Sequence, residues 1–251
     1  MKMGKTIWIM WYQGWDKVPD IVRKCLRSWE KHNPEWQIIK LDKDNIFDYV
    51  PQMKADLPKL ATNPRHTCDV VRIYLMRYLG GVYVDATTFC MKPLDEWIPE
   101  GTFLFSNPAP DRLMATWFQK SEPNTYLYKK YLKEVIDYWN FRINYTDQYE
   151  MKTYIGWPFI AFGLCYERDH LFRHEWDSTH KTSSKACLDK KDPDARGEGT
   201  HYFTHYLTTT TNEVSEEDIK RFESKVDPLY KLTKHYKVKP NSTMGYLLSN
   251  Y

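Results

Sequence analysis

Residues 66–87 read HTCDVVRIYLMRYLGGVYVDAT and predict, in order, a helix, a turn, a strand and a carboxylate. Residues 66–79 are apolar nearly all round, which predicts a buried helix. Gly80 and Gly81 can adopt the left-handed conformation that commonly ends a helix, and residues 82–84 (VYV) predict a strand. The stretch therefore places Asp85 at the carboxyl end of a strand, where open α/β sheets bind their ligands.

A second pattern, near the start of the sequence, predicts a strand, a helix and another strand. Residues 5–12 (KTIWIMWY) are rich in β-forming side chains. Apolar residues then recur every three to four positions over 18–29, as on the buried side of a helix, before an Asn-Pro pair ends the pattern. Residues 35–42 (EWQIIKLD) predict the next strand. Such a βαβ unit implies a parallel sheet with a right-handed crossover, so the predicted fold class is α/β.

The remaining elements are predicted with less regular patterns. The length of 251 residues suits one large α/β domain over 1–251. Residues 177–200 are polar and rich in turn formers, which favours a mobile loop, and 156–165 is a mixed apolar stretch in which Gly156-Trp157-Pro158 forms either a turn or part of an acceptor site. We further predict helices over 44–50, 111–119 and 125–141, and strands over 102–106 and 201–207.

Composition excludes several classes of protein. The chain has 36 basic and 33 acidic residues and a net charge of +3, so we expect no nucleic-acid partner. Its 10 Trp, 19 Tyr and 11 Phe residues either fill the core or offer flat surfaces to sugars and bases. P-loop, Rossmann-dehydrogenase and serine-hydrolase motifs do not occur.

Cysteine usage and hydropathy bear on location. The five cysteines form no C-x-x-C pair and are expected to be reduced thiols, which favours a cytoplasmic protein, or the host cytoplasm for a viral one. No window of about 18 apolar residues predicts a transmembrane segment. The Lys-rich residues 225–239 suit either a solvated tail or a peripheral membrane contact.

Charged residues inside the helix predicted over 66–79 are candidates for a binding site. Asp69 and Arg72 lie three positions apart, on one side of the helix. They pair with each other, or they point into a cleft that they share with Asp85. A carboxylate at a strand end is a hard oxygen ligand for Mg²⁺ or Mn²⁺. Such an ion would neutralise a departing nucleoside diphosphate.

These residues carry a resemblance to a known family. The run D-x-x-R-x(6)-L-G-G-x-Y-x-D-x-[DT] over residues 69–87, with IWIMWYQG near the N-terminus, resembles the glycosyltransferases with the DXD sugar-binding motif, family 32 type. Within that group the chain is most similar to the capsular polysaccharide synthesis proteins. The likeness covers roughly residues 5–106, and YKLTK at 230–234 is similar to a basic motif near the C-terminus of the same proteins.

The resemblance implies a GT-A type fold, with a mixed, mostly parallel sheet flanked by helices. It implies a nucleotide-binding half over about 1–106 and an acceptor-side half over about 107–251. The expected reaction moves a hexosyl group from a nucleotide-sugar, with a UDP-sugar as the expected donor, to a glycan or glycolipid acceptor. Retention of anomeric configuration is expected from the likeness alone.

The resemblance also implies a role for each matching residue. The expected catalytic residues are Asp85 and Arg72. Thr87 stands where the family has a second acidic residue, and a hydroxyl holds a divalent ion more weakly than a carboxylate does. The expected donor-binding residues are Trp11 and Gln13 at the base, Asp69 and Arg72 at the sugar hydroxyls, Tyr83 against the nucleotide, and Asp85 at the metal and diphosphate.

Further candidates come from the C-terminal part of the chain. Lys231 and Lys234 are either a lid over the diphosphate or a solvated helix end. His201 and His205 alternate on a predicted strand and would face the same side. His205 is either a structural histidine or the third member of a metal site for Mn²⁺ or Mg²⁺ with Asp85 and Thr87.

Two other functions compete with glycosyl transfer. A non-catalytic carbohydrate-binding protein would use the aromatic side chains and would bind glycans in EDTA. A metal-dependent phosphodiesterase would also use acidic strand ends, but the early strands lack a second cluster of closely spaced carboxylates and histidines.

Overall fold

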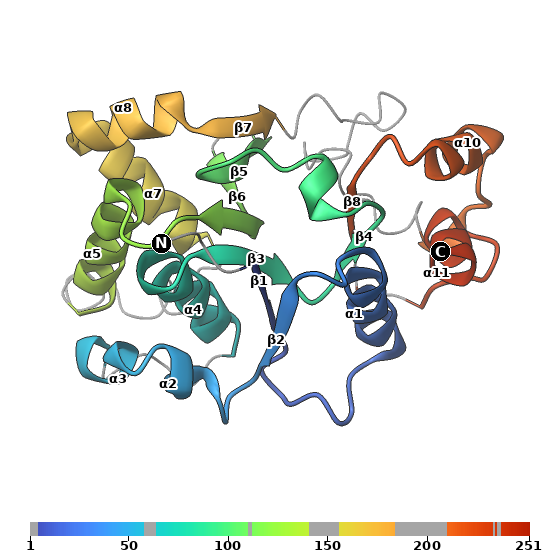
Figure 1. Ribbon diagram of the computed structural model, residues 1–251, viewed down its shortest axis with the longest axis horizontal. Coiled ribbons are helices and arrows are strands. Elements are labelled where there is room, and N and C mark those ends of the chain that lie inside the picture. Colours follow the sequence, from blue (N-terminus) through green and yellow to red (C-terminus); the bar gives the residue numbers. More distant parts are fainter. Residues whose placement is uncertain are drawn as a thin grey trace.

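A computed structural model describes residues 5–57, 64–109, 112–140, 156–183, 210–232, 234 and 237–251 (Figure 1). Its main sheet has six strands in the order β2-β1-β3-β6-β5-β7. All neighbouring pairs are parallel except those of β6 with β3 and β5, so β6 alone runs against the others. The strands are β1 (Thr6–Met10), β2 (Gln37–Leu41), β3 (Gly81–Asp85), β5 (Phe103–Ala109), β6 (Arg112–Ser121) and β7 (His180–Ser183).

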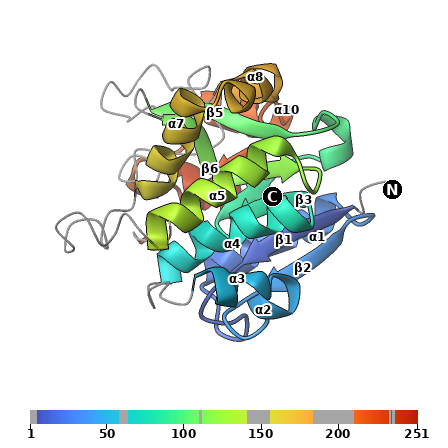
Figure 2. The same ribbon diagram turned by 90° about the vertical axis from the view of Figure 1, so that its left-hand side faces the viewer.

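Helices cover both faces of this sheet. Figures 1 and 2 show α4, α5 and α7 together on one face, with α1 on the other. A second sheet pairs β4 (Thr88–Cys90) with β8 (Leu229–Lys231). The helices are α1 (Asp20–His32), α2 (Ile46–Tyr49), α3 (Gln52–Asp56), α4 (Pro64–Tyr78), α5 (Tyr126–Asn140), α7 (Trp157–Arg168), α8 (His170–Ser178), α10 (Glu216–Ser224) and α11 (Thr243–Asn250), with a 3₁₀ turn, η1 (Leu94–Glu96).

The predicted α/β class, with a mixed and mostly parallel sheet flanked by helices, is confirmed. β1, α1 and β2 form the predicted βαβ unit, and β3 pairs on the other side of β1. Alternate side chains of β1 enter different cores: Trp8 packs with α4 and α5, whereas Ile7 and Ile9 pack with α1. The predicted division near residue 106 falls inside β5, so both parts of the chain contribute strands to one sheet.

The turn between α4 and β3 depends on its two glycines. Gly80 and Gly81 have φ angles of +66° and +92°, in the region that side chains disfavour. A Cβ atom on Gly81 would lie 2.8 Å from the carbonyl oxygen of Thr6. The Gly80 carbonyl accepts a hydrogen bond of 2.8 Å from the indole of Trp8. Glycine therefore allows α4 to end directly beside β1 and to lead into β3.

Two predicted elements were wrong. The helix predicted over 111–119 does not form over its described residues, 112–119, because Arg112–Ser121 is strand β6, between β3 and β5. Its side chains are buried on both faces, with Met114 in the core beside α4 and Trp117 in the core beside α1, so no period of two is visible in the sequence. Residues 180–183 of the predicted loop instead form β7, parallel to β5.

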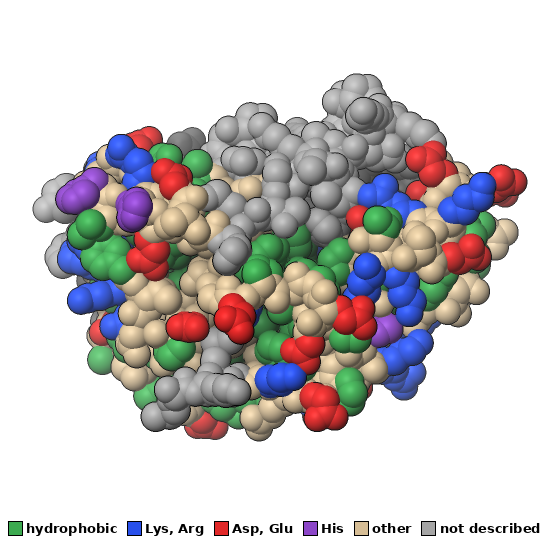
Figure 3. Space-filling model, turned by 45° about the horizontal axis from the view of Figure 1, so that its top comes forward, with side chains coloured by type: hydrophobic (Ala, Val, Ile, Leu, Met, Phe, Trp, Pro, Cys, Tyr) green, Lys and Arg blue, Asp and Glu red, His purple; other side chains and the backbone are tan. Residues whose placement is uncertain are grey.

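The other predicted elements that fall on described residues are confirmed. They are the helices found as α2, α4 and α5 and the strand found as β5. The strand predicted over 201–207 lies outside the described residues, and so do His201 and His205. In the described part of the chain, no helix has both the length and the apolarity to cross a bilayer. On the face shown in Figure 3, acidic and basic side chains are interspersed, as the near-balanced composition predicts.

Candidate functional site

The site is built at the carboxyl ends of the central parallel strands. Met10, the last residue of β1, is paired with Asp85, the last residue of β3. Trp11 follows directly, so its half-buried side chain and the partly exposed carboxylate of Asp85 come from adjacent strand ends. This is the end at which parallel sheets bind ligands, as the sequence predicted.

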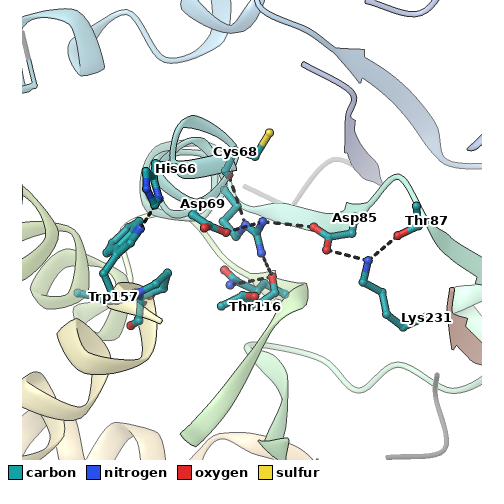
Figure 4. Close-up of polar contacts among 12 residues, drawn as sticks. His66, Cys68, Asp69, Asp85, Thr87, Thr116, Trp157 and Lys231 are labelled. Carbon is teal, nitrogen blue, oxygen red and sulfur yellow. Dashed lines mark hydrogen bonds and ion pairs between the residues drawn. The ribbon is translucent and has the colours of Figure 1, made fainter. Parts of the chain in front are cut away.

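Arg72 connects the helix to the strand ends. Its guanidinium lies 2.8 Å from an Asp69 carboxylate oxygen and 3.3 Å from Oδ1 of Asp85. It also donates hydrogen bonds to the carbonyl oxygens of Thr116 (2.6 Å) and Cys68 (3.3 Å). Figure 4 shows these groups in one network. The first alternative is realised, because Asp69 and Arg72 pair with each other, and Arg72 also reaches Asp85. That the two residues point into a cleft stays a prediction.

Lys231 enters the site from the far end of the chain. β8 pairs with β4 so that Lys231 lies opposite Thr88, and the Leu232 amide donates to the Thr87 carbonyl at 2.8 Å. The Lys231 ammonium therefore lies 3.1 Å from Oδ2 of Asp85 and donates a hydrogen bond to the Thr87 hydroxyl. The C-terminal segment thus contributes a cation to the strand ends.

Lys234 lies over the other candidate group, the indole of Trp11. Its ammonium is 4.3 Å from the ring centroid, a cation–π distance. Burial, with Lys231 nearby, lowers the pKa of Lys234. Gln13 is exposed in the turn that follows Trp11. A base stacked on this face of Trp11 would have to move the lysine side chain aside.

Tyr83 lies beneath the network and not on its surface. Only 1% of the residue is exposed, and the Arg72 guanidinium lies 4.9 Å from its ring centroid. The ring therefore supports Arg72 from below. Its predicted packing against a nucleotide stays a prediction, and in this arrangement Tyr83 acts on a ligand only through Arg72.

Burial and charge set the ionisation of the two carboxylates differently. Burial raises the pKa of Asp69 to about 6, although Arg72 opposes the change. Burial also acts to raise the pKa of Asp85, but Lys231 and Arg72 outweigh it and bring that pKa below its ordinary value. Burial acts to lower the pKa of Arg72, while Tyr83 and the two carboxylates more than offset it. At neutral pH the site therefore holds an ionised Asp85 between two cations.

Some features of the site could not be read from the sequence. The Thr116 carbonyl is a backbone group on the strand mistaken for a helix, so no side-chain signal pointed to it. Gly156-Trp157-Pro158 opens α7, and Trp157 is fully buried, with its indole donating to Nδ1 of His66 at 3.1 Å. Trp157 therefore belongs to the core beside α4 and is not exposed to an acceptor.

Comparison with known families decides the membership of the chain. Residues 1–250 match the family described as capsular polysaccharide synthesis protein. The chain belongs to this family. The resemblance carried by the D-x-x-R and G-G-x-Y-x-D residues is thereby confirmed at the level of the family.

The individual relatives that match this chain are distant from it in sequence. It is 22% identical over 134 residues to inositol phosphoceramide mannosyltransferase 1 of Schizosaccharomyces pombe, covering 51% of this chain and 41% of that protein. It is 30% identical to the initiation-specific alpha-1,6-mannosyltransferase of Candida albicans (38% and 26% covered) and 31% identical to putative glycosyltransferase HOC1 of Saccharomyces cerevisiae (40% and 26%). The matches thus span less than half the length of these relatives. Among solved structures it is similar to the PaToxG glycosyltransferase, with a TM-score of 0.49, 14% identity and coverage of 70% of this chain and 74% of that one.

The described residues do not form a ready site for a divalent ion. Of the predicted ligands Asp85, Thr87 and His205, the last lies outside the described residues. Within the described part of the chain, no group of three or more His, Cys, Asp or Glu side chains could hold a metal. The Lys231 ammonium contacts both Asp85 and Thr87, and Arg72 takes the other carboxylate oxygen. Mn²⁺ or Mg²⁺ stays a prediction, which this arrangement does not favour.

Proposed function

We propose that this chain is a glycosyltransferase that moves a hexosyl group from a nucleoside-diphosphate sugar to a glycan or glycolipid acceptor. One observation carries the proposal: a partly exposed carboxylate, Asp85, lies between Arg72 and Lys231 at a parallel strand end, next to Trp11. Membership of a capsular polysaccharide synthesis family supports it. The matched relatives, which are named as mannosyltransferases or glycosyltransferases, support it too.

Each group has a proposed role that follows from its exposure and charge. Trp11 offers an aromatic face on which a nucleobase stacks, with Gln13 beside it. Asp85 reaches the donor directly, while the buried Asp69 and Arg72 fix the orientation of the Asp85 carboxylate. Lys231, from the C-terminal segment, meets the diphosphate. Lys234 moves from Trp11 to the diphosphate when the base binds.

Glycosyl transfer mainly requires that negative charge on the leaving diphosphate be stabilised. The bond between the anomeric carbon and the diphosphate oxygen breaks, the acceptor hydroxyl forms the new bond, and its proton leaves with the nucleoside diphosphate or a nearby base. As the sugar becomes oxocarbenium-like, charge builds on the departing phosphate oxygen. Fixed cations at that oxygen stabilise the transition state more than the ground state. Retention of configuration remains a prediction.

The donor is proposed as a mannosyl or other hexosyl nucleotide. The names of two of the relatives point to mannose, which favours a GDP-mannose donor over the UDP-sugar expected from the sequence. The base is left to experiment, because Trp11 would stack on either guanine or uracil. The acceptor, a cytoplasmic location and a peripheral membrane contact stay predictions.

Donor consumption without acceptor tests the proposal. The purified chain is incubated with UDP-glucose, UDP-galactose, UDP-N-acetylglucosamine or GDP-mannose, with and without Mn²⁺, and release of free UDP or GDP is measured. We expect slow hydrolysis of at least one donor, abolished by Asp85→Asn but not by Asp44→Asn at an exposed site. If no donor is bound or consumed, the proposal fails. Glycan binding that Asp85→Asn leaves unchanged, without donor consumption, would instead favour a non-catalytic carbohydrate-binding protein.

A further inference from the structure

We propose that the ammonium group of Lys231 takes the cation position of this site, so that the nucleoside diphosphate binds without a divalent metal ion. This inference rests on the proposed function and concerns how the same site neutralises its donor. It follows from three observations: the contacts of Lys231, the way its position is fixed, and the charge of its neighbours.

The contacts of Lys231 are those that a bound cation would make. Its ammonium lies 3.1 Å from Oδ2 of Asp85 and donates a hydrogen bond to the Thr87 hydroxyl. Figure 4 shows the side chain ending between these two groups. Oδ1 of Asp85 lies 3.3 Å from the Arg72 guanidinium. Both carboxylate oxygens therefore already have a cationic partner, and a metal ion would have to bind Asp85 beside these two cations or displace one of them.

The position of Lys231 is built into the fold. β8 is joined to β4 by backbone pairing, and the pairing is extended on either side by the amides of Leu232 and Met91, which donate to the carbonyls of Thr87 and Pro228 at 2.8 Å. Tyr230 is buried against Phe222 of α10. The lysine thus projects from a packed strand, and only its side chain has to order itself.

The charges match a lysine better than a divalent ion. Because Thr87 is neutral, Asp85 supplies the one negative charge that the described residues place at this position, and a single ammonium balances it. A divalent ion beside Asp85 would also be repelled by Lys231 and Arg72 at close range. Among the described residues, two carboxylates interact with four cationic side chains, so these described groups carry a net positive charge toward a diphosphate: Asp69 and Asp85 with Arg65, Arg72, Lys231 and Lys234.

Nucleotide binding in the presence and absence of metal tests the inference. Titration calorimetry measures the Kd of GDP and of UDP for the full chain in EDTA and in Mn²⁺. We expect the Kd of the preferred nucleotide to differ by less than about threefold between the two buffers, because a bound metal contributes well over tenfold where it bridges protein and phosphate. Electron paramagnetic resonance of Mn²⁺ should show the ion free when no nucleotide is present. Tenfold or greater weakening in EDTA, or stoichiometric Mn²⁺ binding by the nucleotide-free chain, would overturn the inference.

Variants of Lys231 separate its charge from its packing. Lys231→Met should weaken nucleotide binding in EDTA by about tenfold or more, since a charge-assisted hydrogen bond to phosphate is lost. Lys231→Arg should keep most of the affinity. Lys220→Met, at an exposed position of α10, is the matched control and should bind as the original chain does. If Lys231→Met folds, by circular dichroism, and binds GDP or UDP normally in EDTA, the inference is wrong.

The double variant Thr87→Asp with Lys231→Met adds a test that does not depend on loss of function. It restores a second carboxylate and removes the ammonium, so nucleotide binding should become at least about tenfold tighter with Mn²⁺ than in EDTA. Indifference of the folded double variant to Mn²⁺ would count against the inference. Metal-dependent binding by the original chain refutes the inference alone, whereas the absence of nucleotide binding and donor consumption in both buffers refutes the proposed function as well.

Discussion

Replacement of Asp69 by Asn should change how the stability of the fold depends on pH. Asp69 is 7% exposed, and burial raises its pKa from 3.8 to about 6. The folded state therefore binds a proton more tightly than the unfolded state does. Because the folded pKa is the higher one, the stability that protonated Asp69 contributes is fully present below about pH 4 and is lost as the pH rises through 6.

The magnitude follows from the pKa difference. Each pKa unit corresponds to about 1.4 kcal/mol, so a rise from 3.8 to about 6 corresponds to about 3 kcal/mol. Asn cannot ionise and lacks this dependence. The free energy of unfolding of the original chain, relative to that of Asp69→Asn, should therefore fall by about 2 kcal/mol between pH 4 and pH 7, which is most of the full difference.

Urea denaturation followed by tryptophan fluorescence, at half-unit steps from pH 4 to pH 8, measures this difference. Asp137→Asn is the control, because Asp137 lies at the surface in an ion pair with Lys133. Its difference from the original chain should stay within about 0.5 kcal/mol over the same range. If the Asp69→Asn difference is flat, or if the original chain gains relative stability as the pH rises, then Asp69 is not the buried, proton-binding group that the structure describes.

Three further predictions concern other parts of the site. Arg72→Met should lower the free energy of unfolding by about 3–5 kcal/mol, because it leaves the buried Asp69 carboxylate without its partner. Arg77→Met, on the same helix, should cost less than about 1 kcal/mol in the same denaturation assay, and equal losses would contradict the network. Gly81→Ala should lower the free energy of unfolding by about 1–3 kcal/mol, because of backbone strain and the close approach of strand β1. The loss should be larger than that of Gly101→Ala, because Gly101 has a φ of +72° but no atom within 4 Å of an added Cβ. Trp11→Ala should weaken GDP or UDP binding by about tenfold in titration calorimetry while Trp11→Phe keeps most of it, since stacking needs an aromatic face; normal binding by the alanine variant would remove Trp11 from the site.

The placement of Arg72 also changes how mutants of this site should be designed. The resemblance implies that Arg72 is a catalytic residue. In the structure this side chain is 5% exposed and joins α4, β3 and β6. Loss of activity in an Arg72 variant would therefore combine a loss of catalysis with a loss of stability. Asp85→Asn, which keeps the size of a partly exposed side chain, is the cleaner test.

Local patterns in the sequence determined the half of the site that lies close together in the chain. The buried helix, the two glycines and the strand end follow from hydrophobic periodicity and from the φ angles that only glycine tolerates easily. The βαβ unit predicts a parallel sheet, whereas the pairing of β3 with β1, which places Trp11 next to Asp85, comes from the tertiary structure. The same residues carried the resemblance to the family.

Only the tertiary structure decided the rest. Strand β6 is buried on both faces, so its composition does not distinguish it from a helix, and its pairing with β3 and β5 sets its conformation. Lys231 is 144 residues from Thr87, and no local pattern predicts that β8 will pair with β4. Such long-range pairing depends on which strand edges the folded core leaves available. The sequence by itself therefore named Lys231 only as a candidate, and the fold placed its charge between Asp85 and Thr87.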